Sequence, residues 1–317
     1  MRRAVRNQRL KDYKEGKRKR LNPLLRVLGC LGLGLLVLVA LLGFLIPSRF
    51  WDGKSRTALV VKEETDNISM IVLDPVTDTI TTFSLPSNVE VEAARQLGTW
   101  RLSSLWQLGQ DEKVGGSLLS TSLTKSFGLP VEAWGDHVVG GLAKMDFLNV
   151  FWGMVAPCQT NLTIKDRVGM GLFALGVKPS GRISIDLKEA GVLRKVTLAD
   201  GETGYQVRDA IPSRITAAFG DAAVSSEGAR VVINYTGANL QEAEEVGQII
   251  QVLGAKVISL LPAKETSEQT LPKEGCLIVG EKSVTRGKIA RLFGCLTQSK
   301  DGETLQVLLG ESFFARY

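Results

Sequence analysis

One stretch of the sequence constrains the fold more than any other: Val27 to Ile46 contains no charged residue and nothing more polar than glycine or cysteine. As an α-helix rising about 1.5 Å per residue, this run would cover the ~30 Å hydrocarbon core of a bilayer. A helix also satisfies its own backbone hydrogen bonds, which lipid cannot do. We therefore predict a transmembrane helix over residues 27–46, with Phe50 and Trp51 as interfacial anchors.

Two other interpretations of this run are a buried helix of a soluble protein and a cleaved signal peptide. A signal peptide has a shorter apolar core, about 7 to 15 residues, followed by a small-residue cleavage site. This run is longer and continues into Pro47, Ser48 and Arg49. The pattern therefore favours a membrane span.

The charge distribution predicts the orientation of the span. Eleven of the 39 lysines and arginines, but only two of the 33 acidic residues, precede residue 27, which leaves 28 cations against 31 anions. A basic segment beside a span stays in the cytoplasm. We expect a single-pass membrane protein with its N-terminus in the cytoplasm, with the lipid bilayer as a partner and most of the chain outside the cytoplasm. Because the remainder carries no excess of cations, nucleic acid is not an expected partner.

The sequence divides into four predicted segments. The small, polar stretch 220–228 has the composition of a short connection between compact units. The predicted segments are a basic cytoplasmic tail (1–26), the transmembrane helix (27–46), a larger extracytoplasmic domain (47–227) and a smaller C-terminal domain (228–317).

The larger domain alternates strand and helix patterns, which predicts an α/β fold. Both helices have apolar stripes at helical spacing, which we expect to face the core: Leu119, Leu123 and Phe127 in one, and Ile164, Val168, Leu172 and Leu175 in the other. No element is predicted for 181–219. The predicted strands are 57–61, 68–73 and 79–83, and the predicted helices are 116–127 and 161–175.

The C-terminal domain contains two strand–helix–strand patterns in tandem. This β-α-β-β-α-β order predicts a four-stranded sheet with helices on one face. The predicted strands are 230–234, 255–261, 276–279 and 305–309, and the predicted helices are 239–253 and 283–293.

The cysteines can be sorted by compartment. Cys30 lies within the predicted span, whereas Cys158, Cys276 and Cys295 would face the oxidising side, where disulfides form. Three is an odd number, so one pair at most can form among them. His137, as a lone histidine, cannot form a zinc site, and we interpret it as an ordinary surface or core residue.

Cys276 and Cys295 are the predicted disulfide pair. Cys276 begins a predicted strand and Cys295 follows Gly294, which ends a predicted helix. Both ends of such a unit can lie at one edge of a sheet, within the ~4.4–6.8 Å Cα separation that a disulfide needs. Two buried free thiols remain the alternative.

The order of basic tail, span, α/β domain and small terminal domain resembles the LytR-CpsA-Psr family of bacterial cell-envelope proteins. Gly115-Gly116, the helix after them and the Gly128–Val131 turn look like one family stretch, and the 66–86 hairpin looks like its central strands. The segment Val231–Gly237 and the ending Leu308–Glu311 are similar to the LytR C-terminal domain. The resemblance covers nearly all of the chain beyond the span.

The resemblance implies a chemistry. Active relatives bind a polyprenyl pyrophosphate-linked glycan and transfer the glycan phosphate to peptidoglycan with magnesium, using arginines for the pyrophosphate and carboxylates for the metal. The family's Arg-Asp pair after a strand-end proline is replaced here by Ser87 and Asn88. Asp66 and Arg101 remain as candidate catalytic remnants, with Asp66 at the position of a metal ligand. A turn residue and a solvated surface charge are equally open interpretations.

We therefore expect a non-catalytic or weakly catalytic envelope protein that binds a lipid-linked glycan precursor, peptidoglycan, a wall polymer or a partner protein outside the membrane. One alternative is an active glycopolymer-phosphate transferase, and only this alternative requires Mg²⁺. A second alternative is a structural anchor without a ligand. An elongated apolar pocket between sheet and helices, with basic side chains at its mouth, would argue against the anchor.

Overall fold

The computed structural model describes residues 47–198, 201–237, 239–262 and 275–317. The predicted tail (1–26) and the predicted span (27–46) lie outside the described residues. Within the described part, no helix combines the length and the apolar character needed to cross a bilayer. Residues 48–317 form one compact unit.

A five-stranded central sheet, in the order β6-β1-β2-β3-β7, organises the first part of this unit. The three middle strands form an antiparallel meander, and each outer strand runs parallel to its neighbour. The three strands predicted from β-branched runs are confirmed to within two residues. The strands are β1 (Thr57–Lys62), β2 (Ile68–Asp74), β3 (Thr79–Leu85), β6 (Ala133–Gly135) and β7 (Arg182–Asp186).

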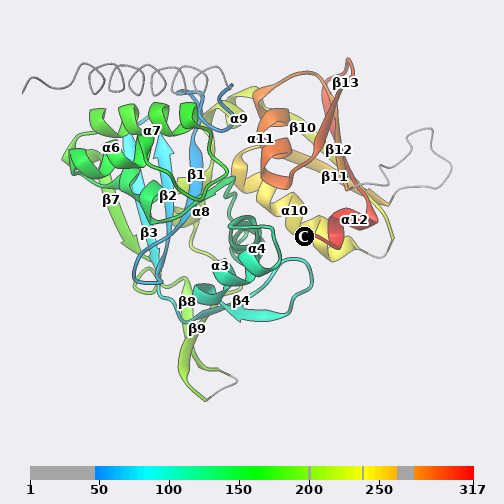
Figure 1. The fold of residues 1–317 in the computed structure, drawn as a ribbon. Helices are drawn as coiled ribbons and strands as arrows, with labels where there is room; N and C mark the ends of the chain where they lie inside the picture. Colours follow the sequence, from blue (N-terminus) through cyan, green and yellow to red (C-terminus); the bar gives the residue numbers. More distant parts are fainter. Residues whose placement is uncertain (1–46, 199–200, 238, 263–274) are drawn as a thin grey trace, which may run out of the picture. The chain divides into compact units, whose positions relative to one another are not determined.

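Both faces of this sheet are buried, and the alternation of side chains along β1 shows how. Ala58 and Val60 belong to one hydrophobic core, together with side chains of α3 and α4. Leu59 and Val61 belong to another, together with side chains of α6 and α7. The result is a three-layer α/β/α arrangement (Figure 1). The helices are α3 (Leu102–Asp111), α4 (Ser117–Phe127), α5 (His137–Gly140), α6 (Phe147–Val155) and α7 (Ile164–Gly176), with short 3₁₀ turns η1 (Gly141–Ala143) and η2 (Pro179–Gly181).

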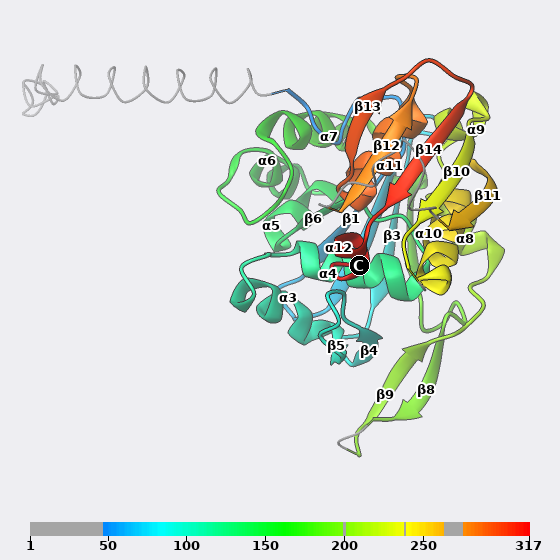
Figure 2. The same cartoon turned by 90° about the vertical axis from the view of Figure 1, so that its right-hand side faces the viewer.

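A second sheet, in the order β5-β4-β9-β8, accounts for much of the stretch without a prediction. Its β8–β9 hairpin extends away from the neighbouring elements in both views (Figures 1 and 2). The elements are β4 (Val89–Glu92), β5 (Thr99–Arg101), β8 (Leu193–Thr197), β9 (Thr203–Val207) and α8 (Ser213–Phe219).

The C-terminal sheet has five strands, not the predicted four, in the order β11-β10-β14-β12-β13. The additional strand β13 runs parallel to β12 and is exposed throughout, so its residues carry no apolar pattern that could have predicted it. The elements are α9 (Ala222–Glu227), β10 (Arg230–Tyr235), α10 (Leu240–Leu253), β11 (Lys256–Pro262), β12 (Cys276–Gly280), α11 (Val284–Phe293), β13 (Leu296–Ser299), β14 (Thr304–Leu309) and α12 (Glu311–Phe314).

The C-terminal sheet packs around a separate hydrophobic core that begins with Val224 of α9. The domain boundary placed after residue 227 stays a prediction.

The two amphipathic helices predicted in the larger domain behave differently. In α4, Leu119, Leu123 and Phe127 are buried as expected. In α7 the prediction was wrong for three of the four residues, because Leu172 is 62% exposed and both Ile164 and Leu175 also face outward. Val168 is partly buried and packs against the core as expected. The buried side of α7 consists instead of Asp166, Arg167, Met170, Gly171 and Ala174.

The cause lies at the start of α7. The Asp166 side chain completes a capping box with Thr163. It also accepts hydrogen bonds from the backbone N–H groups of Phe50 (3.0 Å) and Trp51 (2.9 Å). A buried carboxylate needs such donors. The segment from Ser48 to Trp51 supplies them, so the polar side of α7 faces inward. The prediction of Phe50 and Trp51 as interfacial anchors was wrong, because both side chains are buried in the core that α7 shares with the sheet.

Candidate functional site

Asp66, the candidate metal ligand, lies in the turn between β1 and β2 and is exposed. Its carboxylate pairs with Lys62 Nζ at 2.8 Å. Across the residues with described positions, no group of three or more His, Cys, Asp or Glu side chains could hold a metal ion. A single carboxylate already balanced by a lysine does not fit a magnesium site, which draws on several oxygen ligands.

Arg101, the second candidate remnant, precedes α3 and pairs with Glu202 at 2.9 Å. The two residues that replace the family's charged pair have structural contacts. The Ser87 carbonyl accepts a hydrogen bond from Ser103 N–H (3.3 Å), and the Asn88 amide donates one to the Thr203 carbonyl (2.9 Å). These contacts connect the end of β3 with α3 and β9.

Asp66 and Ser87 follow strand ends on the same side of the central sheet, because Ile68 pairs with Leu85 in the β2–β3 register. The structure therefore places Asp66 and Ser87 at one end of the central sheet. Asp66 pairs with Lys62 and Arg101 pairs with Glu202, so the two candidate remnants do not pair with each other. Their predicted catalytic roles stay predictions.

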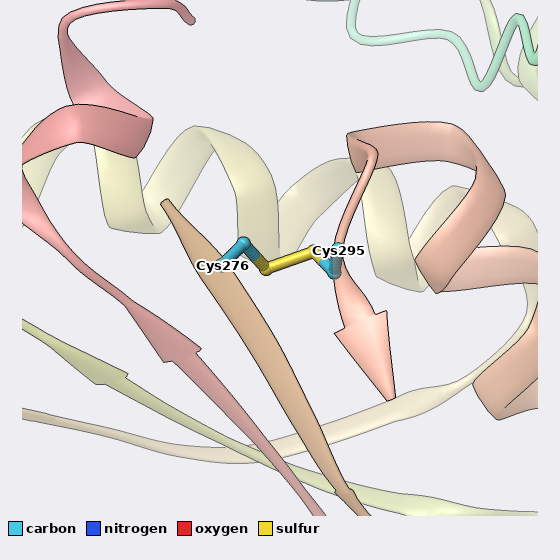
Figure 3. The surroundings of a disulfide bond; sticks show 2 residues. All are labelled: Cys276 and Cys295. Atoms are coloured by element: carbon cyan, nitrogen blue, oxygen red, sulfur yellow. A yellow bond between two sulfur atoms is a disulfide. The ribbon is translucent and has the colours of Figure 1, made fainter. Parts of the chain in front are cut away.

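Cys276 and Cys295 form a disulfide with a Cα–Cα separation of 4.6 Å (Figure 3). The unpredicted strand β13 explains the proximity. Leu277 pairs with Leu296 in the parallel β12–β13 register. Cys276 and Cys295 are the residues before these two leucines, so they lie side by side on neighbouring strands.

Cys158 is a free thiol, and Arg167 Nη1 lies 2.7 Å from its sulfur. Burial raises the pKa of the Cys158 thiol despite that guanidinium. His137 is exposed on the surface, 3.7 Å from Glu64. Neither residue lines the cavity described next.

A cavity of about 270 Å³ lies between α4 and β6 on one side and the α11–α12 region on the other. This cavity is not the elongated apolar pocket between sheet and helices that would argue against a structural anchor, so the anchor alternative stays open by that criterion. The interface between the central sheet and α4 is filled by packed side chains such as Phe83, Leu105 and Leu119.

One wall of the cavity is a row of hydroxyl groups on α4. Ser117, Ser120, Thr121 and Thr124 line it, and their spacing of three and four residues places them on one helix face. The hydroxyls of Ser117 and Ser120 donate to backbone carbonyls, which leaves their oxygens able to accept from a ligand. The Thr124 hydroxyl donates to the Val131 carbonyl and already accepts from the Val131 N–H. The same helix therefore buries leucines on one side and presents hydroxyls on another.

Three arginines make the cavity electropositive: Arg95, Arg291 and Arg316. Glu132 is the acidic residue in the wall, and it is already neutralised. Its carboxylate pairs with Arg291 Nε at 3.1 Å and with Lys288 Nζ at 2.6 Å. Because Arg291 is engaged in this ion pair, Arg95 and Arg316 carry the positive charge that is available to an anion.

Lys288 fixes Glu132 in place. Its side chain is fully buried, it donates to the Arg56 carbonyl, and its ammonium lies 3.5 Å from Asp221. A buried lysine with this many partners holds its neighbours in a defined geometry, because losing one partner leaves an uncompensated charge.

Arg95 occupies the loop between β4 and β5 with an unusual backbone. Its φ is 67° and that of the following Gln96 is 57°, both in the left-handed region that non-glycine residues avoid. Such strain often accompanies a functional position. Within the described ranges, Arg95 forms no ion pair with an acidic side chain, and it is exposed at the cavity.

Aromatic rings complete the walls. Trp134 lies on the α4 side, and Phe293, Phe313 and Tyr317 lie opposite. Phe313 and Tyr317 stack with ring centroids 5.4 Å apart. A Cβ at Gly116 would overlap the ring of Trp134, so this glycine allows Trp134 to approach the start of α4.

Arginines, hydroxyls and aromatic faces in one cavity suit a ligand that is both anionic and rich in hydroxyl groups. Arginine binds phosphate oxygens through paired, charge-assisted hydrogen bonds, and aromatic faces pack against the apolar side of a ring. Sequence analysis missed all of these residues. The hydroxyl row on α4 was visible as a pattern, but the arginines come from distant segments that only folding brings together.

Comparisons with known proteins give structural likeness only. No family model matches the sequence. No curated protein is significantly similar to it. The structure is similar to that of Bacillus subtilis TagT, with 14% identity, 50% of this chain and 87% of TagT covered, and a TM-score of 0.36. It is also similar to that of B. subtilis TagV, with 8% identity, 65% of this chain and 100% of TagV covered, and a TM-score of 0.38.

One solved structure shows TagT bound to LIIa-WTA. Another describes TagT as a LytR-CPS2A-psr family protein with bound octaprenyl pyrophosphate lipid. TagT is thus described as a member of the family that this sequence resembles. At these identities and TM-scores, the likeness assigns no role to any residue of this chain.

Proposed function

We propose that this chain is a single-pass protein of the bacterial cytoplasmic membrane that binds an anionic, lipid-linked glycan precursor or wall polymer outside the membrane, with little or no transfer activity. The observation that carries the proposal is the arginine-lined cavity with its row of hydroxyls. A glycan pyrophosphate provides both the negative charge and the hydroxyl groups that such walls recognise.

The sequence supports the membrane location in this proposal. The apolar run from Val27 to Ile46 and the basic tail before it predict an anchored chain whose remainder is exported. The disulfide between Cys276 and Cys295 agrees with an oxidising compartment.

The non-catalytic part of the proposal rests on charge. Ser87 and Asn88 cannot replace the paired bonds of an arginine or the metal affinity of a carboxylate, and Asp66 is paired with Lys62. Losing one transition-state contact typically lowers a rate about a hundredfold.

Binding can be tested with the full chain in detergent micelles and a polyprenyl pyrophosphate-linked disaccharide as the probe, measured by calorimetry. Charged hydrogen bonds contribute roughly 1.5–3 kcal/mol each, so Arg95→Gln and Arg316→Gln should each weaken affinity at least tenfold. Arg194→Gln on β8, whose guanidinium contacts Gln206, is the matched control and should bind normally. Unchanged affinity in both cavity variants would refute the cavity as the site.

Transfer can be measured with the same lipid, a peptidoglycan acceptor and Mg²⁺. We expect no turnover above background. Turnover that is abolished by Asp66→Ala would instead support the transferase alternative.

A further inference from the structure

The outer surface of α6 is unusually apolar. Phe147, Leu148, Phe151, Trp152 and Val155 are all exposed, with Leu148 at 61% and Trp152 at 57%. They recur at helical spacing, so they occupy one side of the helix. The opposite side, including Val150 and Met154, is buried.

The exposed rings on α6 form a cluster. The centroids of Phe147 and Phe151 are 6.3 Å apart, and those of Phe151 and Trp152 are 5.9 Å apart. Isolated exposed apolar residues are ordinary on a protein surface, whereas a contiguous group marks a contact surface.

The outward stripe of α7 adds Ile164, Leu172 and Leu175 to the exposed apolar residues of this region. The two helices pack side by side (Figure 1). Gly171 of α7 permits close approach, because a Cβ there would overlap Met154 of α6. We refer to the exposed apolar residues of both helices as the α6–α7 face.

The α6–α7 face is connected to the predicted membrane span by a short and fixed segment. In sequence, only Pro47 separates the span predicted at 27–46 from Ser48. Ser48 donates to Asp166 of α7, as do the N–H groups of Phe50 and Trp51. Trp51 also packs on Phe173, with ring centroids 5.2 Å apart. Two residue steps span at most about 7 Å, so the segment that contacts the start of α7 follows directly on the predicted span.

The charged residues around this region suit the same neighbour. Arg49, Lys144 and Lys178 are exposed close to the ends of the two helices. Asp146, the N-cap of α6, is an exposed carboxylate in the same region, so the cations are in excess there. Cations beside exposed tryptophan and phenylalanine are the composition of helices that lie in a membrane interface with anionic lipids.

We infer that the α6–α7 face lies on the outer leaflet of the membrane, with the α6 aromatic side chains inserted among the lipid headgroups. The inference rests on the membrane anchoring in the proposed function. It adds that the exported part is held against the bilayer in one orientation, so that it does not swing on its anchor.

The test uses the full chain in vesicles of phosphatidylethanolamine and phosphatidylglycerol. An environment-sensitive fluorophore is attached through Leu148→Cys, in a background of Cys30→Ser and Cys158→Ser. The control carries the label through Leu240→Cys, since Leu240 is also an exposed leucine on a helix. Quenching by a nitroxide lipid and by aqueous iodide is measured for both.

We expect the nitroxide lipid to quench the label at 148 at least threefold more than the label at 240, and iodide to show the reverse. Equal, weak lipid quenching at both positions in an inserted chain would overturn the docking inference alone. Energy transfer between labelled copies, without lipid quenching, would assign the face to a second copy and also overturn it. Extraction of the chain by alkaline carbonate would overturn both the docking and the membrane anchoring.

Discussion

Helices α4 and α7 have similar apolar periodicity, but the apolar side is buried in α4 and exposed in α7. In α4 the leucine stripe faces the core, and a row of hydroxyls faces the cavity. In α7 the apolar stripe faces outward, while Asp166 and Arg167 are buried. Periodicity therefore shows that a helix has two different sides, but it does not show what covers each side.

The difference arises from what each helix packs against. The buried side of α4 meets the central sheet, which is apolar. The N-terminal turn of α7 meets the backbone N–H groups of the 48–51 segment. A carboxylate can accept hydrogen bonds from these groups, whereas an apolar side chain at the same place would leave them without a partner. The exposed stripe of α7 would then be covered by lipid under our docking inference.

The largest expected effect compares one leucine from each helix. Leu123→Ala in α4 should lower the free energy of unfolding by about 3 kcal/mol, because it leaves a cavity in a packed core. Leu172→Ala in α7 should change it by less than about 0.5 kcal/mol, since that side chain is already exposed. Denaturant titration of the full chain in micelles measures both. Equal losses would show that the α7 stripe is packed after all.

The next effect tests the polar side of α7. In Asp166→Asn, an NH₂ group replaces one carboxylate oxygen and faces N–H and O–H donors. We therefore expect the free energy of unfolding to fall by roughly 2 kcal/mol. Asp146→Asn, at the exposed N-cap of α6, is the matched control and should be nearly neutral because asparagine also caps helices well. A neutral Asp166→Asn would contradict our explanation for the orientation of α7.

A smaller effect is expected from acid. Burial alone would raise the pKa of Asp166, but hydrogen bonds from Ser48, Trp51, Thr163 and Phe50 hold the pKa below its ordinary value of 3.8. The unfolded state therefore binds a proton first, and stability falls as the pH drops below about 4. Unfolding titrations from about pH 6 to pH 3 should show a shallower loss in Asp166→Asn than in the unaltered chain. Parallel curves would exclude Asp166 as a source of the acid sensitivity.

The smallest effect on stability concerns the hydroxyl row of α4. Thr121→Val keeps the shape of a partly exposed side chain, so the free energy of unfolding should change by less than about 0.5 kcal/mol. Affinity for the lipid-linked glycan should fall several-fold if this hydroxyl contacts the ligand. Thr216→Val on α8, whose hydroxyl bonds to the Ser213 carbonyl outside this cavity, is the control. Equal affinity for both variants would remove Thr121 from the site.

Local chemistry was sufficient for much of the fold. The β-branched runs identified the strands β1–β3, and Gly294 marked a helix end that the structure confirms. These signals depend on neighbours in sequence, so no knowledge of the tertiary structure was needed.

The candidate site could not be obtained in the same way. Arg95, Arg291 and Arg316 are far apart in sequence and meet only because α4 and the α11–α12 region enclose one cavity. Likewise, β13 has no apolar pattern of its own, and its hydrogen bonds to β12 define it. Contacts between distant segments depend on shape and on charge compensation, which no local pattern records.

The sequence by itself determined which segments form the central strands and the best-capped helices, because apolar periodicity and capping act over a few residues. Only the tertiary structure decided which side of α7 is buried and which charges share a cavity. The physical reason is that a buried carboxylate or ammonium requires partners, and for Asp166 and Lys288 those partners include residues more than a hundred positions away.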